Sequence, residues 1–326
     1  MNESPHLSTL APAIALLLPC YNEGLTIRRV VEEFSRALPG AVIYVYDNRS
    51  TDNTASEAQA GGAIVRAEPW PGKGNVVRRM FAEIEADIYI MADGDGMYDP
   101  KAALSMARLL TDGHLVMVVG VRRDIYANAH RAGHGLGNRL FNGLYAHLFG
   151  PQFSDIFSGY RVFSRRFVKS FPAVSSGFEI ETEVSVHAWQ LRMRIAEIPT
   201  DYGARQEGSF SKLRTVRDAI RILLTFLILF KEICPARFFG VLSAMLSAVA
   251  LLLAFPLVIT YLKIGLVPRF PTAILVTGMM LLASVVLVSG LILDSLARSR
   301  REQKQMWYIA TGDRPNPVPG VADADR

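Results

Sequence analysis

Two aspartates, Asp93 and Asp95, stand one residue apart directly after the apolar run 88–91. Side chains two positions apart on an extended chain point to the same side, so both carboxylates can reach one ligand. Gly94 and Gly96 lack a Cβ atom and allow the backbone to approach that ligand closely. Mg²⁺ or Mn²⁺ commonly binds one or two protein carboxylates and completes its coordination with water and phosphate oxygens. The spacing therefore predicts a divalent metal site that holds a diphosphate, and a solvated Asp/Gly turn is the alternative for an isolated pair.

Short apolar runs alternate with amphipathic segments before this site and just after it. The predicted strands are 13–19, 41–46, 63–67, 87–91 and 115–121, and the predicted helices are 27–38, a short one after 54, 75–85 and 101–110. Such alternation implies right-handed crossovers and an open, mostly parallel sheet covered on both faces, which is an α/β fold. Ligands on such sheets bind beyond the C-terminal ends of the strands. The polar residues predicted at that edge are Tyr21, Asn22, Glu23, Asp47, Asp93 and Asp95.

Two other nucleotide-binding patterns do not fit the chain. A Walker A loop requires G-x-x-x-x-G-K-[ST], and the segment 72–74, Gly-Lys-Gly, has neither the leading glycine nor the hydroxyl residue. A dinucleotide fingerprint requires G-x-G-x-x-G after the first strand, where residues 19–24 read Pro-Cys-Tyr-Asn-Glu-Gly. The nucleotide site must therefore be of another kind.

Cations and carboxylates gather in three later segments. The region after Val121 contains Arg122, Arg123, His130, Arg131, His134 and Arg139. Beside an acidic metal site it resembles a second anion pocket, although a solvated helix face is an equal alternative for any single residue. The loop 205–214 combines glycine, hydroxyls and cations, a mixture suited to phosphate. The acidic run 179–183 is interpreted as one polar helix face.

Composition and charge limit the function further. The chain has 326 residues, of which 50% are hydrophobic, and carries a net charge of +5. Nine Lys/Arg against five Asp/Glu lie within 192–237, next to the most hydrophobic region, which favours a membrane and phosphate over nucleic acid. The only cysteines, Cys20 and Cys234, form no disulfide framework, so a reducing cytoplasm is expected. Residues 1–12, an N-terminal tail, show no signal-peptide pattern.

Two uncharged segments, 238–262 and 270–293, are each long enough to cross a bilayer. Joined by a short loop, they predict a transmembrane hairpin. Cations on both flanks place the two ends of this hairpin in the cytoplasm. The catalytic domain, 13–214, and the tail, 294–326, are therefore expected there as well. Residues 215–237 are predicted to be an amphipathic helix lying in the membrane interface, or alternatively a helix packed on the soluble domain.

Six motifs occur together in one order: 19–23 (Pro-Cys-Tyr-Asn-Glu), 47–52 (Asp-Asn-Arg-Ser-Thr-Asp), 72–74 (Gly-Lys-Gly), 93–95 (Asp-Gly-Asp), 158–161 (Ser-Gly-Tyr-Arg) and 208–214 (Gly-Ser-Phe-Ser-Lys-Leu-Arg). Each is weak alone. In this order, and followed by a membrane hairpin, they resemble glycosyltransferase family 2, and within it the polyprenyl-phosphate glycosyltransferases. The resemblance covers roughly residues 13–293.

That resemblance implies a GT-A nucleotide-binding domain, a UDP- or GDP-hexose donor, Mg²⁺ or Mn²⁺, and inverting transfer to polyprenyl phosphate (undecaprenyl or dolichyl) at the inner membrane. It implies donor binding by Pro19, Tyr21, Asn22, Glu23, Asp47 and Lys73, metal and nucleotide binding by Asp93 and Asp95, diphosphate contacts from Arg205, Ser209 and Lys212, and lipid-phosphate contacts from Arg122 and Arg131. Some relatives place a glutamine metal ligand where this chain has Met97, so water or backbone would replace it.

Two rival functions are weighed against this one. A polysaccharide-building family 2 transferase would usually carry a Gln-x-x-Arg-Trp motif, which the sequence lacks. A catalytically inactive nucleotide-sugar-binding membrane protein would not need Asp47, Asp93 and Asp95 intact. Homo-oligomerisation, the sugar and the base are left open by the sequence.

Overall fold

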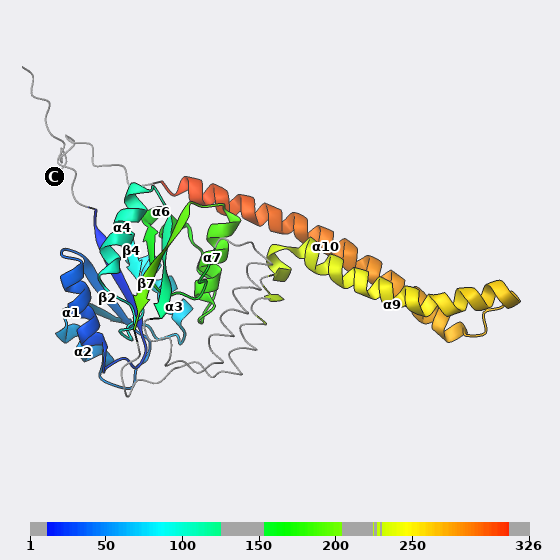
Figure 1. Cartoon of the computed structure of the whole chain (residues 1–326), viewed down its shortest axis with the longest axis horizontal. Coiled ribbons are helices and arrows are strands. Elements are labelled where there is room, and N and C mark those ends of the chain that lie inside the picture. The colour runs from blue at the N-terminus through cyan, green and yellow to red at the C-terminus, as the bar shows by residue number, and fades with distance from the viewer. Residues whose placement is uncertain (1–11, 125–152, 204–223, 225–226, 229, 313–326) are drawn as a thin grey trace, which may run out of the picture. The chain divides into compact units, whose positions relative to one another are not determined.

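The computed structural model describes residues 12–124, 153–203, 224, 227–228 and 230–312. It divides into two compact units, Met1–Arg214 with Gln305–Arg326, and Thr215–Lys304. The strands are β1 (Ile14–Cys20), β2 (Val42–Asp47), β3 (Ile64–Ala67), β4 (Ile88–Met91), β5 (Met117–Asp124), β6 (Arg161–Ser164) and β7 (Ile195–Tyr202) (Figure 1). The helices are α1 (Ile27–Ala37), α2 (Thr54–Ala60), α3 (Lys73–Glu83), α4 (Ala102–Asp112), α6 (Arg165–Ser170), α7 (Ile180–Gln190), α9 (Pro235–Ile264) and α10 (Phe270–Ala310).

The first unit is built on a seven-stranded sheet in the order β3-β2-β1-β4-β6-β5-β7. Strand β1 pairs in parallel with β2 and β4, as β2 does with β3 and β5 with β7. Among the strands that the structure describes, only β6 runs antiparallel to its neighbours. Ser158, just before β6, donates a hydrogen bond to the Gly120 carbonyl of β5 at 2.6 Å. The start of β6 therefore lies beside the C-terminal half of β5. The predicted mostly parallel α/β fold is confirmed.

Helices cover both faces of this sheet. Helices α1, α2 and α4 pack on one face, where Leu16 and Leu18 of β1 and Phe34 of α1 are buried in one apolar cluster. On the other face Phe81 of α3 contacts Phe163 and Phe171 edge to face, at centroid distances of 5.7 and 6.2 Å. A central strand is apolar on both faces because neither reaches water, which explains the unbroken apolar run of β1.

The second unit contains α9 and most of α10, both long and apolar enough to cross a membrane by length and composition. The two helices pack antiparallel: Ser243 of α9 donates to the Ala283 carbonyl of α10 at 2.8 Å, and the earlier Phe239 lies against the later Gly290, where an added Cβ would be 2.6 Å from its Cβ. Ala250 and Leu257 follow Ser243 at intervals of seven on α9, and all three are buried. That interval is the signature of a helix–helix seam. The predicted hairpin segments 238–262 and 270–293 lie within these helices.

Both helices extend beyond the predicted apolar segments. Helix α9 begins with Pro235 in its first turn and ends before Gly265, whose left-handed φ of 70° terminates the helix. Helix α10 continues to Ala310, into the segment predicted as a tail, because 294–310 contains neither glycine nor proline. About half of the predicted interfacial helix 215–237 lies outside the described residues, and its last three residues, 235–237, belong to α9.

Candidate active site

The C-terminal ends of β1, β2 and β4 meet at one edge of the sheet, as the sequence predicts. Asp47 ends β2 and pairs with Cys20 at the end of β1. Met91 of β4 pairs with Leu17 of β1, so that Asp93 leaves the sheet close to the same edge. Register therefore brings the predicted donor-binding residues and the predicted metal ligands to one region.

The loop after β1 and the loop after β2 are bonded to each other. The Asn22 amide donates to Ser50 Oγ at 2.8 Å, and Asn22 Oδ1 accepts from the Thr51 amide at 2.8 Å. The Glu23 amide donates to Thr54 Oγ1 at 2.8 Å. Asn22 adopts a left-handed φ of 52°, which asparagine tolerates better than most residues. Pro19 lies within β1 and Glu23 is buried, whereas Tyr21 is exposed.

A clamp that sequence reasoning missed is formed by Asn48, which follows β2 directly. Its Nδ2 donates to the carbonyls of Glu68 and Trp70 at 3.1 and 2.7 Å, and its Oδ1 accepts from the Gly72 amide at 2.7 Å. One buried side chain thereby fixes the whole loop that precedes Lys73. In the sequence, Asn48 is marked only by its place after Asp47 at the end of the apolar run 41–46.

Lys73 is buried between two carboxylates. Its Nζ lies 2.5 Å from Asp93 Oδ1 and 2.6 Å from Glu181 Oε1, and 9% of its side chain is exposed. Burial alone would lower the pKa of Lys73, but the charges of Asp93 and Glu181 outweigh burial and hold that pKa above its ordinary value. The amine is therefore a permanent cation beside the predicted metal ligand.

Glycines around Lys73 allow two backbones to touch. A Cβ at Gly72 or Gly74 would lie 2.1 Å from the carbonyl oxygen of Ser176 or Ser175, and Gly72 has a φ of +120°. A Cβ at Gly159 would lie 2.8 Å from Asp93 Oδ2. The Gly-Lys-Gly spacing thus lets the segment before α7 pack on the start of α3, which brings Lys73 to Glu181.

Tyrosine side chains support the loop that carries the two aspartates. The Tyr98 hydroxyl accepts from the Gly159 amide at 2.9 Å, and its ring lies 5.1 Å from the rings of Tyr160 and Tyr202. Burial, then the charge of Asp93, raises the pKa of Tyr98 above its ordinary value. Burial, then the charge of Asp95, raises the pKa of Tyr202 to about 12. Both phenols are neutral at physiological pH.

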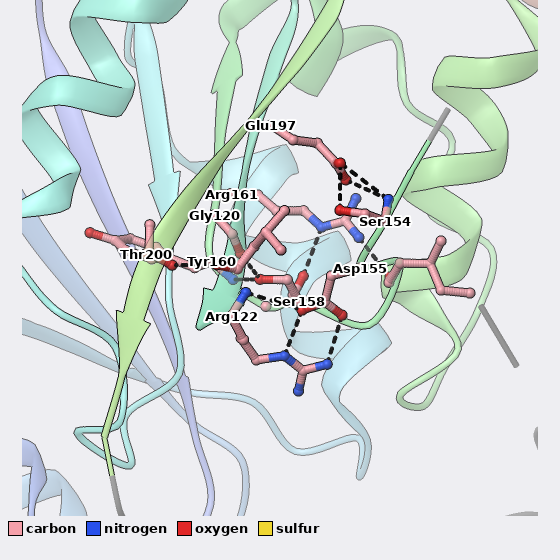
Figure 2. A network of polar contacts seen from close by, with 12 residues as sticks. Gly120, Arg122, Ser154, Asp155, Ser158, Tyr160, Arg161, Glu197 and Thr200 are labelled. Atoms are coloured by element: carbon pink, nitrogen blue, oxygen red, sulfur yellow. Dashed lines mark hydrogen bonds and ion pairs between the residues drawn. The ribbon is translucent and has the colours of Figure 1, made fainter. Parts of the chain in front are cut away.

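Arg122 is held by Asp155 (Figure 2). Its Nε and Nη2 each donate to a different Asp155 oxygen at 2.7 Å, and its guanidinium lies 5.5 Å from the Tyr202 ring centroid. Burial opposes its charge, but the Asp155 hydrogen bonds raise the pKa of Arg122. Nearby, the fully buried Arg161 donates to the carbonyls of Ser158 and Ile156 at 2.8 and 2.7 Å. The contact of Arg122 with a lipid phosphate stays a prediction. In this structure the positive charge of Arg122 is paired with Asp155.

Comparison with known proteins decides the family. Residues 15–171 match the profile of glycosyl transferase family 2. Glycosyltransferase AglJ of Haloferax volcanii is 34% identical over 229 residues, which span 70% of this chain and 75% of AglJ. The chain belongs to glycosyltransferase family 2. Protein RfbJ of Shigella flexneri is 49% identical over 122 residues, 37% of this glycosyltransferase and 95% of RfbJ.

A solved structure agrees with this assignment. Glucosyl-3-phosphoglycerate synthase from Mycobacterium tuberculosis, in complex with Mn²⁺, UDP-glucose and phosphoglyceric acid, superposes with a TM-score of 0.56 at 25% identity. The similarity covers 68% of this chain and 80% of the synthase. The first unit of this glycosyltransferase therefore has the predicted GT-A fold.

The donor set of the glycosyltransferase fits a hard divalent cation. Asp93 and the buried Asp95 supply carboxylate oxygens, and Asp95 Oδ1 also accepts from the Met97 amide at 3.2 Å. Among the described residues no group of three or more His, Cys, Asp or Glu converges on one point. Mg²⁺ and Mn²⁺ tolerate such a set because phosphate oxygens and water complete their shell. Met97 is buried, with its sulfur 3.4 Å from the Tyr202 hydroxyl.

The interpretation of the acidic run 179–183 as one polar face is wrong for Glu181. That residue is 5% exposed and bonded to Lys73, and the Glu183 carboxylate accepts from the amides of Val174 and Ser175 at 2.9 and 2.7 Å. Glu181 is thus a site residue that sequence reasoning missed. The remaining predicted site residues, Arg131, Arg205, Ser209 and Lys212, lie outside the described residues.

Proposed function

We propose that this glycosyltransferase transfers a hexose, with inversion, from a UDP- or GDP-hexose to polyprenyl phosphate at the cytoplasmic face of the inner membrane. One observation carries the proposal: a nucleotide-sugar transferase domain shares its chain with two packed helices, α9 and α10, that are apolar enough to cross a bilayer. A lipid-linked acceptor gives such helices a function, because it keeps the enzyme where its acceptor lies.

Donor binding is assigned to the edge where β1, β2 and β4 end. The exposed Tyr21 ring and the Asp47 carboxylate suit the base and ribose, while Pro19, Asn22 and Glu23 shape that loop. Asp93 and Asp95 would hold the metal against the donor diphosphate. A bound Mg²⁺ or Mn²⁺ would offset the negative charge that develops on the leaving diphosphate. In this proposal Arg205, Ser209 and Lys212 contact the same diphosphate.

The acceptor chemistry matches the protonation states in the site. A phosphate monoester has its second pKa near 6, so polyprenyl phosphate is mostly a dianion at pH 7 and needs no strong base. Lys73, Tyr98 and Tyr202 all keep their protons there, because their pKa values are raised. The work left to the protein is to place the nucleophile in line with the anomeric carbon and to neutralise charge. Arg122 and Arg131 are proposed for the acceptor phosphate.

Purified full-length protein in detergent tests the proposal. UDP-glucose, UDP-galactose and GDP-mannose are each supplied with a short polyprenyl phosphate, and mass spectrometry detects a lipid-linked monosaccharide. We expect product with one donor, loss of product in excess EDTA, and loss of product in Asp95→Asn, because an amide is a poorer ligand for a hard cation.

Other products would point to other functions. A parallel reaction with phosphoglyceric acid, which accompanies UDP-glucose in the mycobacterial synthase structure, distinguishes a soluble acceptor from a lipid. Transfer to phosphoglyceric acid alone, growth of a polysaccharide, or the absence of both donor hydrolysis and transfer would each contradict the proposal.

A further inference from the structure

Lys73, Asp93 and Glu181 form a charged cluster from three separate elements. Lys73 begins α3, Asp93 follows β4, and Glu181 lies in the first turn of α7. The Lys73 and Glu181 side chains are 9% and 6% exposed, whereas the Asp93 side chain is 33% exposed. Only the aspartate is therefore substantially open to a ligand from solvent.

The charges in this cluster do not cancel. A lysine paired with Asp93 alone would neutralise that carboxylate and oppose the binding of a second cation to it. Glu181 adds a second carboxylate 2.6 Å from Lys73 Nζ, so the cluster contains one positive and two negative groups. An unpaired carboxylate as buried as Glu181 would be strongly unfavourable, which ties Glu181 to Lys73. The surplus negative charge is thus available at Asp93.

We propose that Glu181 is a positioning residue of the donor site: it shares the charge of Lys73 and so leaves Asp93 negative enough to hold a divalent cation beside the donor diphosphate. This inference rests on the metal-dependent donor site of the proposed function. Glu181 contacts Lys73 and acts on the metal only through it. The Gly72 and Gly74 contacts with the segment before α7 keep the two side chains together.

Binding of Mn²⁺ to the full-length protein with UDP present and no acceptor tests this role. The loss of the free Mn²⁺ signal in electron paramagnetic resonance gives the dissociation constant. We expect Glu181→Gln to raise that constant about tenfold, because one nearby charge commonly shifts an ion equilibrium by at least a factor of ten. Glu85→Gln is the control, since Glu85 pairs with Lys169 and Arg165 before β4, far along the strand from Asp93. It should leave the constant unchanged.

The double variant Lys73→Met/Glu181→Gln separates charge from folding. It removes one positive and one negative group and restores the surplus of the wild-type cluster, so Mn²⁺ affinity should recover relative to Glu181→Gln. Lys73→Met alone leaves the buried Glu181 without its cation and should be less stable than the double variant, but the folded protein should bind Mn²⁺ at least as tightly as wild type. If Glu181→Gln does not fold, the double variant serves as the test, since it should bind Mn²⁺ as tightly as wild type. A purely structural role for Glu181 predicts a double variant no better than the single one.

Three results would overturn the inference. They are equal Mn²⁺ affinity in wild type and Glu181→Gln, no recovery in the double variant, and weaker Mn²⁺ binding in Lys73→Met. Wild-type protein that binds UDP but no Mn²⁺ would remove the metal from the proposed function and this inference with it. A failure of transfer to polyprenyl phosphate, with the Mn²⁺ pattern intact, would overturn only the acceptor.

Discussion

Two cations, the buried Lys73 and the partly buried Arg122, lie beside the loop that carries Asp93 and Asp95, and they are paired in different ways. Lys73 shares one charge between Asp93 and Glu181, whereas Arg122 makes a planar, bidentate contact with Asp155. Both cations act on the pKa of Tyr98, so both belong to the electrostatics of one site. The lysine cluster keeps a surplus negative charge and the arginine pair keeps none.

The two kinds of pairing suit two different roles: binding a cationic ligand and fixing the local structure. A compact ammonium can satisfy two carboxylates from different directions, which suits a place where negative charge must remain for a ligand. A guanidinium matches one carboxylate through two parallel hydrogen bonds, which fixes geometry. We therefore expect changes in the lysine cluster to alter metal binding, and changes in the arginine pair to alter stability and, through Arg122, binding of the proposed acceptor phosphate.

The largest expected effect is that of Asp93→Asn. It removes the exposed carboxylate and leaves Lys73 and Glu181 as a neutral pair, so transfer should fall at least about a hundredfold, or about 2.7 kcal/mol. Initial rates of lipid-linked product formation measure this. Asp99→Asn is the matched control, because it makes the same substitution close to Asp93 in the chain. The asparagine Oδ1 can still accept from the Lys101 amide, as the Asp99 Oδ1 does. Equal rates for Asp93→Asn and wild type would end the distinction between the two clusters.

Asp155→Asn should come next, as a loss of stability. It leaves the Arg122 guanidinium partly buried without a counter-charge, and breaking such a pair costs about 3 kcal/mol. Chemical denaturation followed by near-ultraviolet circular dichroism measures the free energy of unfolding. The double variant Arg122→Met/Asp155→Leu should lose much less, since no charge is left unpaired. Mn²⁺ affinity of folded Asp155→Asn should match wild type, and a tenfold loss there would place the pair in the metal site.

A third ion cluster, more exposed, provides a pH reference. Hydrogen bonding from Arg79, against some opposing burial, and contacts from Tyr46 and Arg66 lower the pKa of Glu83 from 4.5 to about 2. Because the folded-state pKa is the lower one, this stabilisation is complete above about pH 4.5 and is lost as the pH falls toward 2. Denaturation midpoints measured across that window should fall more steeply in wild type than in Glu83→Gln. Salt should reduce the difference, and identical slopes would contradict the assignment.

The smallest expected effect is that of Tyr202→Phe. It removes a hydroxyl whose contact with Met97 sulfur spans 3.4 Å and keeps the ring beside Arg122 and Tyr98. The free energy of unfolding should change by less than about 0.5 kcal/mol. Tyr98→Phe is the comparison, because it leaves the buried Gly159 amide without its acceptor and should cost about 1–3 kcal/mol. Similar losses in both variants would show that Tyr202 supports the loop through its hydroxyl.

Sequence reasoning predicted the strands that lead to Asp47 and Asp93 because local signals define them. Apolar runs of strand length end at polar residues, and parallel pairing then brings those ends together. Glu181 was misread because residues 179, 181 and 183 alternate, and on a helix that spacing spreads them over several faces. Only the packing of α7 on α3 shows that one is buried.

Long-range partners were also beyond the sequence. Arg122 was predicted to be a cation for phosphate, but its partner Asp155 lies 33 positions away. The sequence identifies the motif 158–161 but does not show what its residues contact. Gly159 leaves room for the Asp93 carboxylate, and Arg161 bonds buried carbonyls, neither of which a one-dimensional pattern encodes.

The place of β6 between β4 and β5 has a consequence for how the chain is made. Strands β4 and β5 are consecutive in the sequence, yet the space between them is filled by a strand that the ribosome produces later. At roughly 5–20 residues per second, the apolar edge of β4 stays unpaired for seconds during synthesis. Such an edge can pair with other chains, so the nascent chain is most prone to aggregate between the synthesis of β4 and that of β6. The acidic loop at the end of β4 gains its last partners only when β7 follows, because Tyr202 packs on Tyr98 and the Gly203 amide donates to the Met97 carbonyl at 2.8 Å.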